Sequence, residues 1–125
     1  MTRNRKSAKA AGTRFETAIA TYLAAELDDD RIERRRLTGA KDRGDIAGLR
    51  HHGQRLVLEV KDYGGQIKAG PWVEEAHTEA GNDGALCGVV IAKRRGTTNP
   101  GAAYVLMTVN DLIALLTGHR PDTDL

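Results

Sequence analysis

The stretch of the chain that most limits its fold is the apolar run "ALCGVVIA" at residues 85–92. A strand that is apolar at successive positions, and not only at alternate ones, is typical of a sheet covered on both faces. The run therefore predicts a central strand with other elements packed above and below it. It also contains Cys87, the single cysteine of the chain, which excludes a disulfide framework and a cysteine-rich zinc site.

The elements predicted on either side of this run follow an order typical of an α/β fold. Apolar residues at helical spacing, with Pro71 placed for a first helical position and Gly118 for a C-terminal cap, predict three helices. The predicted helices cover residues 13–27, 71–83 and 110–118. The other predicted strands cover residues 31–38, 45–49, 55–62 and 102–108.

The length of 125 residues favours one domain. The element order predicts that this domain is α/β, with a mixed central sheet flanked by helices. We expect it to span residues 13–118, between a flexible basic arm at 1–12 and a C-terminal tail at 119–125.

Basic residues gather in three segments, although the net charge of the chain is only +2. Clustered lysine and arginine favour a polyanion partner such as a nucleic acid over the alternative that these segments are solvated tails and loops. Such contacts bind phosphates without recognising sequence. The residues predicted to contact the nucleic acid are Arg3, Arg5, Lys6, Arg34, Arg35, Arg36, Lys93, Arg94 and Arg95.

The segment "GDIAGLRHHGQRLVLEVKD", residues 44–62, predicts two strands joined by a hairpin, yet charged residues occupy strand positions. Because alternate residues of a strand face the same way, Glu59 and Lys61 share one face of the sheet. The apolar residues that alternate with them take the other face and pack into the core.

The loop of this hairpin sets the pairing of its two strands. A three-residue loop at 51–53, ending in a glycine, would place Arg50 opposite Gln54. Counting back along both strands from that pair predicts that Asp45 lies opposite Glu59.

Two opposed carboxylates hold their β-carbons about 5 Å apart and repel one another. Either one of them has a raised pKa, or a cation lies between them, and Mg²⁺ prefers oxygen ligands of this kind. Lys61 reaches the same space, where it can orient or help deprotonate a water molecule, or stabilise charge on a phosphate. These residues together favour metal-assisted phosphodiester hydrolysis. The alternative is that Asp45 only begins a strand, and that Glu59 and Lys61 form a solvated face.

The sequence "GD", with its acid fourteen residues before the glutamate of "EVK", resembles the PD-(D/E)XK nuclease superfamily. With "GTRFE" on the leading helix, the pattern is similar to that of the archaeal-type and phage Holliday junction resolvases. The resemblance covers residues 12–107. It implies a mixed sheet flanked by helices, a requirement for Mg²⁺ or Mn²⁺, and cleavage of the DNA backbone.

The resemblance also implies roles for individual residues. Asp45 matches the first metal-binding acid of the family, and Glu59 matches the second, with the backbone carbonyl of Val60 as a further ligand. Lys61 matches the catalytic lysine. The proline that precedes the first acid in the family is replaced here by Gly44.

Two further candidates have structural explanations beside the functional ones. Glu16 matches a glutamate that many family members use to contact the metal, directly or through water. It also completes a capping box with Thr13 at the start of the predicted helix. His77 lies four residues after Val73, on or near the apolar stripe of its helix, and we interpret it as a satisfied histidine and not as a catalytic base.

The resulting prediction is a Mg²⁺-dependent endodeoxyribonuclease that resolves four-way DNA junctions, with Mn²⁺ able to substitute. The resemblance implies a twofold homodimer, which would match the symmetry of the junction. Two alternatives stay open: a PD-(D/E)XK nuclease of other specificity (restriction-like, repair or flap-type), and a DNA-binding module without turnover. The chain has no apolar run of 18 residues and no signal-peptide core, so we expect no membrane span and a cytoplasmic location, in a bacterium or a phage-infected host.

Overall fold

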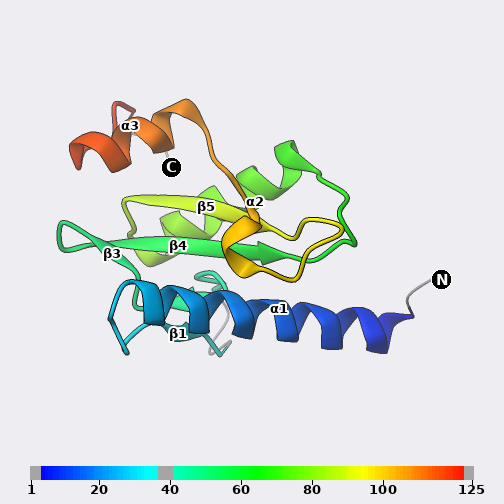
Figure 1. Cartoon of the computed structure of the whole chain (residues 1–125). Coiled ribbons are helices and arrows are strands. Elements are labelled where there is room, and N and C mark those ends of the chain that lie inside the picture. The colour runs from blue at the N-terminus through cyan, green and yellow to red at the C-terminus, as the bar shows by residue number, and fades with distance from the viewer. Residues whose placement is uncertain (1–3, 37–40, 123–125) are drawn as a thin grey trace.

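The computed structural model of the protein describes residues 4–36 and 41–122 and confirms the predicted class, an α/β fold with a mixed sheet flanked by helices (Figure 1). In chain order its elements are α1 (Arg5–Glu26), β1 (Glu33–Arg34), β2 (Ile46–Ala47), β3 (Arg50–His51), β4 (Gln54–Lys61), α2 (Ala69–Asp83), β5 (Cys87–Ala92), the 3₁₀ turn η1 (Pro100–Ala102), β6 (Tyr104–Leu106) and α3 (Val109–Thr117).

The sheet has the strand order β1-β2-β4-β5-β6, with β3 paired to the start of β4. Strands β4 and β5 are parallel and are joined through α2, whereas the other pairs are antiparallel. All six residues of β5 are buried, as expected for a strand that is covered on both faces. The long apolar run is therefore an interior strand of the sheet, between β4 and β6.

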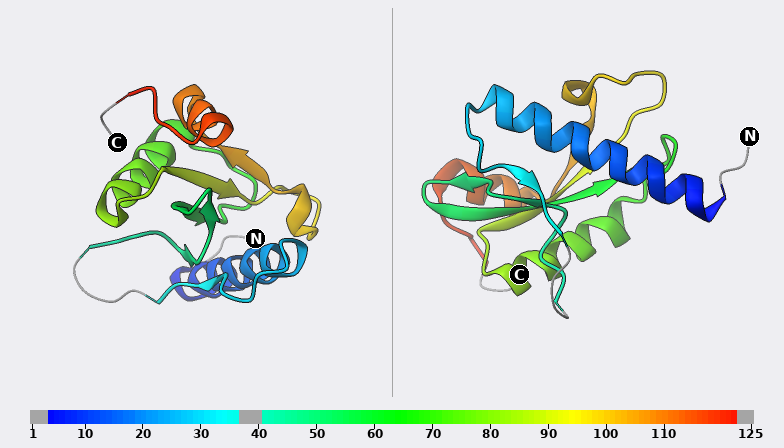
Figure 2. Two further views of the ribbon diagram at one scale, coloured as in Figure 1. Left: turned by 90° about the vertical axis from the view of Figure 1, so that its left-hand side faces the viewer. Right: turned by 90° about the horizontal axis from the view of Figure 1, so that it is seen from below.

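Two helices cover the two faces of this sheet, α1 on one side and α2 on the other (Figure 2). Leu58 and Val60 of β4 belong to the core cluster that Phe15 and Ile19 of α1 complete. On the other face, α2 lies so close to β5 that a Cβ on Gly88 would come within 2.2 Å of a backbone oxygen of α2. Glu59 and Lys61 consequently share the opposite face, as predicted, and this face meets α2.

The first helix begins eight residues earlier than the predicted boundary. Asn4 is its N-cap, and its side-chain oxygen accepts a hydrogen bond of 2.8 Å from the backbone N–H of Ser7. The capping box predicted at Thr13 is therefore wrong, and residues 5–12 are helix and not a flexible arm. The segment is rich in alanine and lysine, which are strong helix formers, and its first turns project beyond the sheet (Figure 1).

The predicted three-residue hairpin loop is also wrong. His51 pairs with Gln54, and Arg50 pairs with Arg55, so the turn has two residues. These are His52 and Gly53, with φ of 51° and 76°. Two positive φ values are the requirement of the type I′ turn that best fits the twist of a hairpin.

The pairing nevertheless returns to the predicted alignment at β2, where Ile46 pairs with Leu58. The first strand spans one more residue than the second between this pair and the Arg50–Arg55 pair. The extra residue is accommodated around Gly48, which has φ of 89° and where a Cβ would come within 2.2 Å of a backbone oxygen. One residue further out, Asp45 lies beside Glu59, as predicted.

The remaining elements differ from the predicted ones mainly in length. Helix α2 begins two residues before Pro71, and β6 is short because the turn η1 precedes it. Helix α3 ends at Gly118 in the left-handed conformation (φ 82°), as predicted. Of the strand predicted at 31–38, residues 37 and 38 lie outside the described part. No helix within the described ranges is long and apolar enough to cross a membrane.

Candidate active site

A cleft of roughly 880 Å³ lies beside the C-terminal end of β4, between that strand and α1. The four side chains predicted to act in catalysis, Glu16, Asp45, Glu59 and Lys61, all line it, together with Val60. They come from three segments of the chain that are distant in sequence. The cleft therefore collects the residues that the sequence pattern singled out.

Asp45 is held in place by the backbone of β4 on both sides of Glu59. Its own N–H donates to the carbonyl oxygen of Leu58 at 2.8 Å, and its carboxylate Oδ2 accepts from the N–H of Val60 at 2.7 Å. Burial, followed by the negative charge of Glu59, raises the pKa of Asp45 to about 8. The two acids are thus close enough to repel one another.

Lys61 supplies the positive charge nearest to these acids. Its Nζ lies 3.3 Å from Oε1 of Glu59 and 2.9 Å from Oε2 of Glu75 on α2. Burial lowers the pKa of Lys61, but the hydrogen bond to Glu75 and the charge of Glu59 outweigh it, so the pKa rises above its usual value. Lys61 is therefore an ammonium group at neutral pH.

Glu16 lies in the middle of α1 and has no role as a helix cap. Its Oε2 accepts a hydrogen bond from Nε of Arg34 at 2.7 Å, across the space between α1 and β1. The charge of Glu16 contributes to the raised pKa of Asp45. The capping role predicted for Glu16 is therefore wrong, and the residue instead forms an ion pair at the edge of the cleft.

Two further acids next to Glu59 were not predicted as site residues. Asp42, Glu59 and Glu79 each have a carboxylate oxygen within 4.8 Å of the others, an arrangement that can hold a metal ion. Burial, and then the neighbouring Glu59, raise the pKa of Glu79 to about 11. A sequence signal was present, because Glu79 lies three residues after Ala76 on the buried stripe of α2 and is charged.

The structure brings three of the clustered basic residues to the cleft. Lys9 and Arg95 line it, and Arg34 reaches it through Glu16. Nε of Arg95 donates to the carbonyl oxygen of Gly64 at 3.2 Å, which fixes the arginine on the loop after β4. Lys9 belongs to the basic N-terminal segment, but we had not predicted it as a DNA contact.

The other predicted DNA contacts are dispersed. Arg35 lies 3.9 Å from Asp83 at the end of α2, and the guanidinium of Arg94 lies 4.8 Å from the ring centre of Tyr104. Arg5, Lys6 and Arg36 are exposed, and Arg3 lies outside the described residues. Basic residues that are neighbours in the sequence are therefore not all neighbours in the fold.

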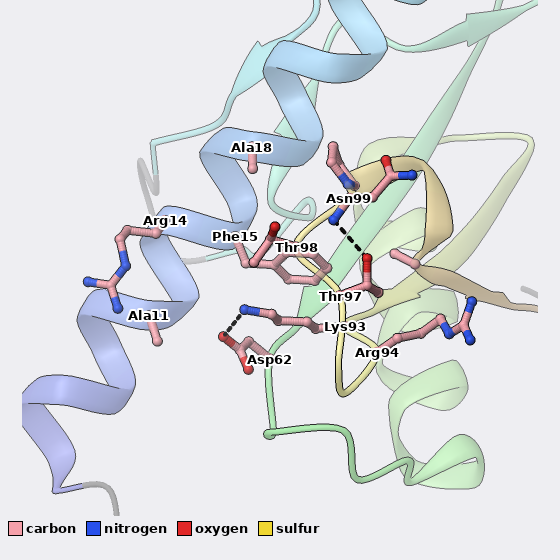
Figure 3. A pocket seen from close by; sticks show the side chains of 12 residues that line it. Ala11, Arg14, Phe15, Ala18, Asp62, Lys93, Arg94, Thr97, Thr98 and Asn99 are labelled. Carbon is pink, nitrogen blue, oxygen red and sulfur yellow. Dashed lines mark hydrogen bonds and ion pairs between the residues drawn. The ribbon is translucent and has the colours of Figure 1, made fainter.

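A smaller cavity of roughly 220 Å³ adjoins the cleft, between α1 and the loop that follows β5 (Figure 3). Both are lined by Asp62. Lys93 extends along the ring of Phe15, with its Nζ 5.9 Å from the ring centre and 3.9 Å from Oδ2 of Asp62 (Figure 3). The cleft and the smaller cavity together therefore extend along α1, away from Asp45 and Glu59.

The carboxylate oxygens of the cleft can hold a divalent cation. The ammonium group of Lys61 lies beside them, and the basic residues Lys9 and Arg95 line the same cleft. The chain matches no family model, no curated protein and no solved structure. The chemistry of the cleft is accordingly argued from its own side chains.

Proposed function

We propose that the protein is a Mg²⁺-dependent endodeoxyribonuclease that cuts four-way DNA junctions, and that Mn²⁺ can replace Mg²⁺. The observation that carries the proposal is the placement of Asp45 beside Glu59, with the ammonium group of Lys61 3.3 Å from Glu59, in one cleft. A half-buried acid and a buried acid next to a lysine are the equipment for hydrolysis of a phosphodiester.

The residues of the cleft fit a hard divalent ion. Asp45, Glu59, the carbonyl oxygen of Val60 and Glu16 would hold it, and all are oxygen donors of the kind that Mg²⁺ prefers. Oε2 of Glu59 is buried and has no hydrogen-bond partner among the described residues, so it retains a lone pair for a ligand. When bound, such an ion acts as a Lewis acid towards phosphoryl oxygens and lowers the pKa of water.

Lys61 would stabilise negative charge on the phosphate and orient the attacking water. Its contacts with Glu59 and Glu75 hold it as a cation, which favours these roles over that of a general base. The side chain is only 13% exposed, so its charge acts with little screening by solvent. The ion pair with Arg34 would hold Glu16 at the edge of the site.

Basic residues around the cleft support DNA as the substrate. Lys9 and Arg95 line the cleft itself, and Arg5 and Lys6 lie on the projecting turns of α1. These side chains can contact phosphates on both sides of a scissile bond without recognising bases. A DNA-binding module without turnover would gain nothing from several buried acids beside its phosphate contacts, because they repel phosphates.

Specificity for a four-way junction comes from the resemblance to the junction resolvases. Such an enzyme must cut two strands symmetrically, and a twofold homodimer would match the symmetry of the substrate. A nuclease of other specificity is the alternative, and it is distinguished by the substrate that is cut.

A cleavage assay tests the proposal. A labelled four-way junction, a flap and a linear duplex of the same sequence are incubated with the protein in Mg²⁺, in Mn²⁺ and in EDTA. We expect cleavage of the junction in either metal, none in EDTA, and loss of cleavage with retained binding for Lys61→Ala. Glu74→Gln, which changes an exposed acid of α2, is the matched control. Unchanged cleavage by Lys61→Ala would refute the role of the lysine, and cleavage of the duplex at the same rate would refute the junction specificity.

A further inference from the structure

Glu79 is the one buried acid of α2 that accepts no hydrogen bond from a donor among the described residues. It is 2% exposed, and neither of its carboxylate oxygens has a hydrogen-bond partner there. Asp83, one turn further along the same helix, is also buried, but its carboxylate accepts a hydrogen bond from Nε of Arg55 at 3.2 Å and lies 3.9 Å from Arg35. Arginine side chains therefore neutralise one of the two buried acids of the helix, Asp83, but not the other, Glu79.

The groups that face Glu79 are themselves acids, and they disfavour its charged form. They are the carboxylates of Asp42 and Glu59, and Oε2 of Glu59 is itself buried without a hydrogen-bond partner. The nearby ammonium of Lys61 lies against Oε1 of Glu59 and against Glu75. A buried carboxylate is costly unless a cation or a proton neutralises it.

We infer that Asp42, Glu59 and Glu79 form a second binding site for a hard divalent cation such as Mg²⁺ or Mn²⁺, on the α2 side of Glu59. It is distinct from the position between Asp45 and Glu59 that the proposed function uses, and it does not depend on DNA cleavage. The nearest oxygens of the three acids lie within 4.8 Å of one another. Oxygens that share one such ion are separated by at most about 4 to 5 Å, because each lies about 2.0–2.6 Å from it.

The three ligands would connect the segment before β2 with β4 and α2. Asp42 lies in the segment before β2, which is fixed to α2 by a hydrogen bond of 2.8 Å from Nδ2 of Asn82 to the carbonyl oxygen of Asp42. Glu59 lies on β4 and Glu79 on α2. An ion here would therefore attach this segment to the sheet and to α2, and it would fix the carboxylate of Glu59 for its role in the cleft.

The inference is tested by counting Mn²⁺ ions bound to the full chain without DNA, using isothermal titration calorimetry and electron paramagnetic resonance of free Mn²⁺. We expect the natural sequence to bind two ions. Glu79→Gln should bind one, because the second site loses a charged ligand, and Asp45→Asn should retain the ion at Glu79. Glu74→Gln, the exposed acid on the same helix, should still bind two.

Asp42→Asn gives a second test that does not alter a buried position, since Asp42 is exposed. We expect it to weaken the binding of one ion by about tenfold or more, and to reduce the increase in Tm that Mn²⁺ produces. One ion bound by the natural sequence, with no change in Glu79→Gln or Asp42→Asn, would mean that a proton and not a metal neutralises Glu79, and would overturn the inference. Two bound ions without DNA cleavage would overturn the nuclease proposal and leave this site standing.

Discussion

Glu79 of α2 and Asp111 of α3 are both buried acids, but one is surrounded by acids and the other by hydrogen-bond donors. Asp111 is fully buried on α3 and is surrounded by donors. Its carboxylate lies 2.7 Å from Nε2 of His77 and accepts hydrogen bonds of 2.9 Å from Arg120 and from the N–H of Thr108. Glu79 faces two other carboxylates. Burial is common to both, so the partners decide what each acid does.

The pKa shifts of the two acids express the same contrast. Burial acts to raise the pKa of Asp111, but the hydrogen bonds from His77, Thr108 and Arg120 outweigh it and hold the pKa below its usual value. The pKa of Glu79 is raised to about 11 by burial and by Glu59. An acid placed among donors fastens elements together, here α3 to α2. An acid placed among acids requires a ligand, and it marks a site.

The largest effect should come from Asp45→Asn, which changes one acid of the cleft. We expect cleavage of junction DNA to fall about 1,000-fold or more, because stabilisation of transition-state charge by a bound ion is worth several kcal/mol. The free energy of unfolding in EDTA should not decrease, since the substitution removes a repulsion with Glu59. Single-turnover cleavage and urea unfolding measure the two quantities. A variant that cleaves at the normal rate would remove Asp45 from the site.

Asp111→Asn should have the next largest effect, on stability and not on cleavage. Removing one partner of a buried ion pair typically costs about 3–5 kcal/mol, because the remaining charge is left uncompensated. Here that charge is Arg120, whose side chain is 12% exposed and which would keep only the more exposed Asp122 as a partner. We expect a clear decrease of the free energy of unfolding, measured in urea.

Asp122→Asn is the matched control, because Asp122 pairs with the same arginine but is more exposed. Its effect on unfolding should be much smaller. If both variants lowered the free energy of unfolding equally, the burial of Asp111 would not strengthen its ion pair. The contrast with Glu79 would then be wrong.

The two acids are also expected to give opposite dependences of stability on pH. Asp111 has a folded pKa below its ordinary value of 3.8, so it contributes stability above that pH, which is lost as the pH falls through the folded pKa. Glu79, with its pKa raised from 4.5, keeps a proton in the folded state that the unfolded chain loses above pH 4.5. In EDTA its effect is therefore a loss of stability as the pH rises.

Urea unfolding between pH 3 and pH 8 in EDTA separates these contributions. Asp111→Asn should flatten the acid side of the profile, and Glu79→Gln should flatten the decline above pH 4.5. If both variants altered the same side, the opposite environments of the two acids would be contradicted.

The sequence predicted the centre of the fold and the neighbouring positions of Asp45 and Glu59, but the second success depended on two errors that cancelled. The predicted loop had one residue too many, because His52 adopts a positive φ that is uncommon for residues other than glycine. The extra residue at Gly48 then restored the pairing. Local turn chemistry cannot reveal this compensation, since the close approach that requires Gly48 comes from Arg31, in a different segment.

Other features depended on contacts between distant segments and were not predictable from local patterns. The start of α1 is a different case, because the cap at Asn4 is local, and it was missed because residues 5–12 carry no apolar periodicity. The partner of Glu16 was missed because Arg34 approaches it only in the folded chain. Arg120 was assigned to a C-terminal tail, yet it reaches back to Asp111. Glu79 differs from these, because a charge on the buried stripe of α2 was visible in the sequence.

The smallest effect should come from Glu79→Gln on stability in the absence of metal, and its sign is the sharpest test of the comparison. Replacing a buried, unpaired acid by a neutral side chain of the same shape should increase the free energy of unfolding in EDTA by about 1 kcal/mol. The same change at exposed Glu74 should leave it unaltered. In saturating Mn²⁺ the order should reverse, because the natural sequence then gains stability from an ion that the variant does not bind. A variant that is less stable than the natural sequence in EDTA would mean that Glu79 already has a partner in the fold, and that it resembles Asp111 after all.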